Sequence, residues 1–122
     1  MNMRQKADWL STYGQRELCI ERLMKERGWW KRRMEVGSSQ AKCRVIELEQ
    51  ALDREIDRQV DDRKNMERAI QTVPDERLRL LLEYRYFDQL SWEELAEKMN
   101  YSYQHVFRLH KQALKALQVA EQ

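Results

Sequence analysis

The chain has 122 residues, 36% of them charged and 42% hydrophobic, with a formal net charge of +2 at pH 7. This length allows one domain, or one small domain with an extension. A net charge this low argues against strong non-specific binding to nucleic acid, although it permits a local basic face. No apolar run approaches the roughly 20 residues that span a bilayer, and the first residues lack the apolar core of a signal peptide. We therefore expect a cytoplasmic protein whose isolated Cys19 and Cys43 are reduced thiols.

The composition favours helix throughout. Only three glycines and one proline supply turns, and Glu, Arg, Leu, Lys and Gln are all good helix formers. No strand pattern is evident. We predict an all-α fold with a helical extension over residues 1–73, a long hairpin or coiled-coil-like element, followed by a smaller helical domain over residues 74–122.

The first expected helix runs from about Lys6 to Met34, with Gly14 and Gly28 as candidate interruptions. Its apolar residues recur at steps of three and four, and they are Trp9, Tyr13, Ile20, Leu23, Met24, Trp30 and Met34.

Residues 25–33 of this helix hold five basic residues, one acid and the pair Trp29 and Trp30. Basic and aromatic side chains together can indicate nucleic-acid contact. The alternative, which we favour, places Trp30 in the helical core, Trp29 at its rim and the charges in solvent. An exposed Trp29 would instead favour a partner surface.

A loop at residues 37–39 precedes a second helix from about Gln40 to Gln71. Its predicted seam alternates steps of four and three: Val45, Glu49, Leu52, Ile56, Gln59, Arg63, Met66, Ile70 and Val73. Six of these nine are apolar, which makes an imperfect heptad seam and argues against a long continuous coiled coil. The two helices are expected to form an antiparallel hairpin or to pair with a second copy, so we expect a homo-oligomer.

Pro74 is expected to begin the next helix, because proline suits a first helical turn. The boundary between the two parts is placed between Gln71 and Asp75, and this helix is expected to end near Asp88. Its apolar face would pack behind the elements that follow, and it comprises Leu78, Leu81, Leu82, Tyr86 and Phe87.

Residues 91–117 have the spacing of a helix-turn-helix. Ser91 and Glu94 form a capping-box pattern at the start of a short helix. Asn100 tolerates the left-handed conformation that ends a helix, and Ser102 can cap the next one. The second helix has an apolar face at Val106, Leu109, Ala113, Leu114 and Leu117.

The charges distinguish the two helices. Residues 102–118 carry Arg108, Lys111 and Lys115 with no acid, whereas the preceding helix carries three glutamates and one lysine. A basic helix beside an acidic one can present one face to phosphates, and the second helix of such a pair can enter the DNA major groove. The alternative is a small helical hairpin with an ordinary solvated face.

This stretch resembles region 4 of the sigma-70 factor family, the part that reads the promoter −35 element. The matching residues are Ser91, Glu94, Leu95 and Ala96 in the first helix, then Ser102, Ala113, Leu114 and Leu117. Residues 73–117, which end with the segment RYFDQLSWEELAEKMNYSYQHVFRLHKQALKAL, also resemble the RinA/ArpU-like phage transcriptional regulators. For the N-terminal half, that resemblance is one of length and helical character only.

The resemblance implies which residues contact double-stranded DNA. The base-reading positions fall on Tyr103, Gln104, Phe107 and Arg108, just after Ser102 at the helix start. Gln104 can pair with adenine and Arg108 with guanine. His105, Lys111 and Lys115 would lie beside phosphates.

Tyr103 and Phe107 depart from the charged residues usual in the family, so a −35 consensus is not assumed as the target. Their rings could contact thymine methyl groups. For Phe107 an equal alternative is packing against the N-terminal helices or a second subunit.

Catalysis is not expected. The chain has no glycine-rich phosphate loop and no Gly-x-Ser-x-Gly. His105 and His110 lie about 140° apart around a helix and cannot share a metal, so no metal or cofactor is predicted.

The resemblance implies a late-gene activator type of transcriptional regulator, encoded by a phage or prophage and acting in the bacterial host cytoplasm. The alternatives are a helical scaffold that docks on RNA polymerase and a phage DNA-packaging small subunit.

Overall fold

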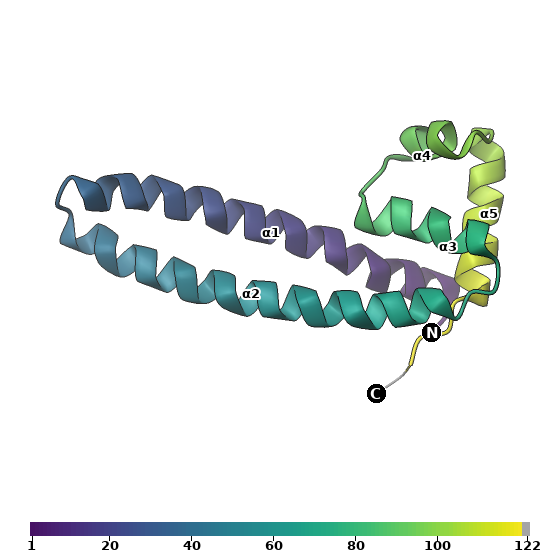
Figure 1. Cartoon of the computed structure of the whole chain (residues 1–122), viewed down its shortest axis with the longest axis horizontal. Coiled ribbons are helices and arrows are strands. Elements are labelled where there is room, and N and C mark those ends of the chain that lie inside the picture. The colour runs from purple at the N-terminus through teal and green to yellow at the C-terminus, as the bar shows by residue number, and fades with distance from the viewer. Residues whose placement is uncertain (121–122) are drawn as a thin grey trace. The chain divides into compact units, whose positions relative to one another are not determined.

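The computed structural model describes residues 1–120, and every regular element within them is a helix, which confirms the all-α prediction. The elements follow in the order shown in Figure 1: α1 (Met3–Glu35), α2 (Ser39–Gln71), α3 (Glu76–Leu82), the π-helical turn η1 (Glu83–Phe87), α4 (Trp92–Met99) and α5 (Tyr103–Ala116). No helix in the described part of the chain is long and apolar enough to cross a membrane.

The chain packs into two compact units. The hairpin unit comprises Gln15–Asp62, and the C-terminal unit comprises Met1–Gly14 with the segment that begins at Arg63. Each of the long helices α1 and α2 therefore contributes to both units. That residues 1–73 serve in oligomerisation or partner binding and residues 74–122 in DNA binding stays a prediction.

In the hairpin unit, α1 and α2 run antiparallel (Figure 1) around a narrow core of Ile20, Ala41, Val45, Leu48 and Leu52. The turn that joins them depends on Gly37, whose φ of 96° lies in the left-handed region. Its N–H donates to the Met34 carbonyl at 3.0 Å, and the Ser38 N–H donates to that of Arg33 at 3.3 Å. Together these bonds form a Schellman motif, which satisfies carbonyls at the end of α1.

The predicted seam of α2 is wrong at its centre. Ile56 is 38% exposed, whereas Leu48, which the predicted seam omits, is buried. Arg16 of α1 explains why the observed seam differs from the predicted one. Its guanidinium donates to Glu55 at 2.9 Å and contacts Asp62 at 3.1 Å. Turning Glu55 toward α1 directs the next residue about 100° around the helix, toward solvent.

Polar contacts continue through the centre of the hairpin, where the Gln59 amide donates to the Glu17 carboxylate. Met24, predicted on the apolar face of α1, is 47% exposed. Cys19 and Cys43 are both exposed free thiols.

Neither Gly14 nor Gly28 interrupts α1, which is continuous from Met3 to Glu35. Gly14 instead makes room for another segment of the C-terminal unit. A Cβ atom added there would lie 2.3 Å from Oε1 of Gln89, whose amide donates to the Tyr86 carbonyl. Nothing lies within 4 Å of a Cβ atom added at Gly28.

The C-terminal unit has a single hydrophobic core that draws on all its segments. Leu10 and Tyr13 of α1 and Met66 and Ile70 of α2 are buried against α3, α4 and α5. The beginning of α1 also closes the end of α5, close to which it lies in Figure 1, because the Lys6 ammonium donates to the carbonyls of Leu114 at 2.9 Å and Leu117 at 2.6 Å. A cation is well placed there, where the helix leaves carbonyls without partners.

Asp75, and not Pro74, begins α3. The Asp75 carboxylate accepts a hydrogen bond from the Arg77 N–H at 2.9 Å, so it is the N-cap and Pro74 lies before it. A carboxylate is a strong cap because it satisfies a free N–H at the positive end of the helix. The helical path continues through η1 to Phe87, where the Asp88 N–H donates to the Glu83 carbonyl at 3.1 Å.

Candidate nucleic-acid interface

The first helix of the candidate interface, α4, begins with the predicted capping box. Ser91 Oγ accepts from the Glu94 N–H and a Glu94 carboxylate oxygen accepts from the Ser91 N–H, both at 3.2 Å. These hydrogen bonds lower the pKa of Glu94, with the backbone bond the larger cause. Leu95 and Ala96 are the buried residues of α4. The small side chain of Ala96 suits a close helix crossing.

Asn100 ends α4 in the left-handed conformation, with φ 58° and ψ 43°, as the sequence predicts. Its N–H donates to the Glu97 carbonyl at 3.2 Å, and the Tyr101 N–H donates to that of Ala96 at 3.0 Å. This pair of bonds is a Schellman motif. The motif reverses the chain within two residues and leads directly into Ser102.

The second helix, α5, is capped by Ser102, whose Oγ accepts from the His105 N–H at 3.1 Å. Its predicted apolar face is confirmed, since Val106, Leu109, Ala113 and Leu114 are buried and so is Leu117 at the C-cap. Burial of this face leaves the opposite side of α5 in solvent.

Four polar residues occupy that solvent side: Gln104, Arg108, Lys111 and Lys115, all of them exposed. At about 100° per residue they lie within an arc of roughly 60°. No acidic residue is present anywhere in α5. The structure thus brings these predicted contact residues together in one basic stripe, called the α5 stripe below.

The other predicted contact residues lie at its edges. Tyr103 is 47% exposed, and Phe107 is half-buried with its ring centroid 4.6 Å from that of Trp92 in α4 and 4.8 Å from that of Tyr103. Phe107 therefore packs within its own domain, on neither of the partners named for it. His105 packs edge-on against Tyr101 at 4.7 Å, with its Nδ1 3.3 Å from an Arg108 nitrogen.

His110, whose burial the sequence did not predict, joins α5 to the rest of the domain. Nε2 of His110 lies 2.7 Å from the Tyr86 hydroxyl, and its ring packs edge-on against Trp92 at 4.8 Å. Burial, with a smaller effect from the charge of Arg85, lowers the pKa of His110 to about 4. Burial raises the pKa of Tyr86 to about 12.

Both partners are therefore neutral at pH 7 and share one hydrogen bond between the tyrosine hydroxyl and the imidazole. Arg85 also contacts Trp92, with its guanidinium carbon 4.4 Å from the ring centroid. One guanidinium nitrogen donates to the Leu90 carbonyl at 2.7 Å. This network fixes α4 against α5. The position of His110 beside the apolar residues Leu109 and Ala113 was the available sequence signal for its burial.

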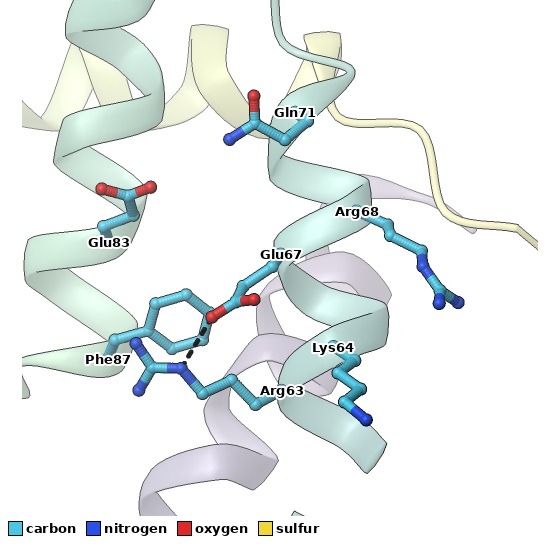
Figure 2. Close-up of a pocket in the computed structure, with 7 residues that line it drawn as sticks. All are labelled: Arg63, Lys64, Glu67, Arg68, Gln71, Glu83 and Phe87. Carbon is cyan, nitrogen blue, oxygen red and sulfur yellow. Dashed lines mark hydrogen bonds and ion pairs between the residues drawn. The ribbon is translucent and has the colours of Figure 1, made fainter. Parts of the chain in front are cut away.

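An open hollow of about 370 Å³ lies in the C-terminal unit. Figure 2 shows its lining side chains, where the last turns of α2 face η1. Arg63 donates to Glu67 at 2.8 Å and its guanidinium carbon lies 4.3 Å from the Phe87 ring centroid. Glu83 faces the hollow from η1, so both signs of charge line it. Arg63 is paired in this way, and the two glutamates oppose an anion, so the hollow is poorly suited to binding phosphate. The described residues contain no cluster of three metal-ligating side chains.

A capped helix, a two-residue reversal and an exposed basic second helix together define a helix-turn-helix domain. Residues 74–119 match the family model of sigma-70, region 4, a DNA-binding family that is not catalytic. The match covers 46 of the 122 residues, from Pro74 through the end of α5, and so says nothing of the hairpin unit. No curated protein and no solved structure matches the chain.

Proposed function

We propose that the protein is a sequence-specific DNA-binding regulator of transcription that inserts α5 into the major groove. The observation that carries this proposal is the α5 stripe, which is exposed, basic and free of acids on the second helix of a region 4-like domain. A helix presented in this way can reach base edges while its cations contact phosphates.

Within the stripe the residues take different roles. Gln104 and Arg108 lie toward the N-terminal end of α5 and carry the amide and guanidinium groups that recognise adenine and guanine. Lys111 and Lys115 follow on the same face and neutralise phosphates. Tyr103 and His105 border the base readers, and Ser102 fixes the helix start. Since Phe107 packs on Trp92, it contributes to recognition by supporting the Tyr103 ring, 4.8 Å away.

The test is binding-site selection with the purified protein, followed by fluorescence anisotropy on the selected duplex and on scrambled ones. Arg108→Ala should lower affinity for the selected duplex by about 1–3 kcal/mol and relax specificity. Lys111→Ala should weaken binding to all duplexes alike and reduce the slope of log K against log salt by about 1. Gln112→Ala, at an exposed position of α5 without charge, is the matched control. Equal affinity of wild type and both variants for every duplex would refute the proposal.

The resemblance to RinA/ArpU-like regulators extends the proposal to a phage or prophage protein that activates late genes. We also propose that it acts as a homo-oligomer through the hairpin unit, where Leu18, Ile46 and Val60 are 56%, 48% and 47% exposed. A gene position beside DNA-packaging genes at the end of an early operon would support late-gene activation. A position remote from phage genes would contradict it.

A second candidate is a helical interaction protein that keeps the region 4-like fold and docks on RNA polymerase or serves in phage DNA packaging. The packing of Phe107 favours it, because one of the four implied reading positions is engaged with Trp92. Co-purification with polymerase, without selection of any duplex, would favour this candidate.

A further inference from the structure

The outer face of α1 carries a second group of exposed cations, in the hairpin unit. Arg22, Lys25, Trp29, Arg32 and Arg33 are all exposed. At about 100° per residue they fall within an arc of roughly 100°, and at 1.5 Å per residue they extend over about 16 Å. These five residues, called the α1 stripe, form one continuous surface of four cations and a tryptophan.

The acid nearest the centre of this surface is neutralised from the neighbouring helix. The Arg44 guanidinium of α2 donates to the Glu26 carboxylate at 2.7 Å, and this hydrogen bond is the main reason that the pKa of Glu26 is lowered. Glu21 borders the stripe at its N-terminal end. Among the described residues, none of the four stripe cations has an ion-pair partner. Their charge is therefore available to an external anion.

Trp29 holds one of these cations in place. Its side chain is 42% exposed, and the Arg33 guanidinium carbon lies 3.5 Å from its ring centroid. Trp30 packs against it nearly at right angles, with ring centroids 4.7 Å apart. This exposure is the condition under which the sequence favours a partner surface at this patch. Because Arg33 already covers a ring face, Trp29 serves as a platform for that cation and is poorly placed to stack on a nucleic-acid base.

We propose that the α1 stripe binds the phosphate backbone of duplex DNA without reading its sequence. Duplex DNA carries one negative charge per roughly 1.7 Å of its axis, so a 16 Å row of cations can neutralise several phosphates. The stripe has no Asn or Gln to pair with adenine, its tryptophan is engaged with Arg33, and its cations are spread along one open helix face, where they meet phosphates. This function goes beyond sequence recognition by α5 and does not depend on it.

The proposal is tested on the full chain by fluorescence anisotropy with a random-sequence duplex over a series of salt concentrations. Lys25→Gln with Arg32→Gln removes two stripe cations and keeps good helix formers. The matched control, Lys42→Gln with Arg54→Gln, removes one exposed lysine and one exposed arginine from α2 of the same unit, neither of them in an ion pair. Both pairs are made in the wild type and in an Arg108→Ala, Lys111→Ala background, and circular dichroism confirms that each variant is folded.

The stripe variant should reduce the slope of log K against log salt by about 2 in both backgrounds, since each phosphate contact contributes about 0.9. The control should leave the slope unchanged. An unchanged slope in the stripe variant would overturn the proposal, as would equal losses in stripe and control, because these would reflect net charge alone. If the stripe variant keeps its slope while the protein still selects a duplex, only the α1 stripe proposal fails. If the stripe variant loses slope but the protein selects no duplex, only the α5 proposal fails.

Discussion

Lowering the pH from 7 to 5 should destabilise the C-terminal unit through His110. The folded protein holds the pKa of this imidazole at about 4, first through burial and then through the charge of Arg85, against 6.5 for the ordinary group. Between these two values the unfolded chain binds a proton that the folded chain does not. The free energy of unfolding therefore falls as the pH is lowered through this window. Above the window, His110 causes no change in the free energy of unfolding with pH.

The size of the effect follows from the pKa difference. Each pH unit inside the window is worth about 1.4 kcal/mol, so the whole shift corresponds to about 3 kcal/mol and the part between pH 7 and pH 5 to about 2 kcal/mol. Stopping at pH 5 also avoids most of the titration of Glu26 and Glu94. Their lowered pKa values stabilise the fold above the unfolded value of 4.5, and this stabilisation is lost only at more acidic pH.

The assay is urea unfolding followed by circular dichroism at pH 7, 6 and 5. The double variant Tyr86→Phe, His110→Phe replaces both hydrogen-bonding partners with apolar rings, which avoids leaving a buried hydroxyl without a partner. It should lose the acid-dependent fall. His105→Gln, which leaves His110 in place, should keep it. The same fall in the double variant, or no fall in the wild type, would refute the proposed role of this imidazole.

Four further outcomes are expected. Gly28→Ala should raise the free energy of unfolding by about 0.5–1 kcal/mol in urea titrations, because the position is helical and open; a loss would contradict this. Lys6→Met should cost about 1–2 kcal/mol in the same assay through its two lost carbonyl contacts, and an unchanged midpoint would refute the cap. Leu82→Ala should cost about 2–5 kcal/mol, since the side chain is fully buried; a smaller loss would mean that the core closes around the cavity. Light scattering should find a dimer or larger oligomer, and a monomer at high concentration would contradict oligomerisation.

The helix-turn-helix was readable from the sequence because its determinants are local. Ser91 with Glu94, Asn100, and Ser102 each act on backbone groups within five residues, so the type and position of each residue predict both helices and the turn. The exposed face of α5 was equally predictable, since an apolar stripe at helical spacing leaves the polar residues opposite it. The observed helices agree with these predictions to within one or two residues.

The centre of the hairpin and the packing of the domain could not be read in this way. Whether Ile56 or Glu55 faces α1 depends on Arg16, which lies 39 residues away from Glu55 in the chain and pairs with it only after the helices meet. Phe107 satisfies the pattern of a base reader equally well until Trp92 is placed beside it. Hydrophobic periodicity describes one helix at a time, so it cannot show which side chain of the neighbouring helix a residue will meet.

The sequence by itself determined the helical content, the caps, the reversal at Asn100 and the acid-free face of α5, because propensity and capping act over a few residues. Only the tertiary structure decided that Lys6 closes α5, that His110 is buried as a neutral partner of Tyr86, and that Trp29 stays exposed. Burial, hydrogen bonding between distant segments and the availability of a cation depend on which groups come together in space. Those distances arise when the helices pack.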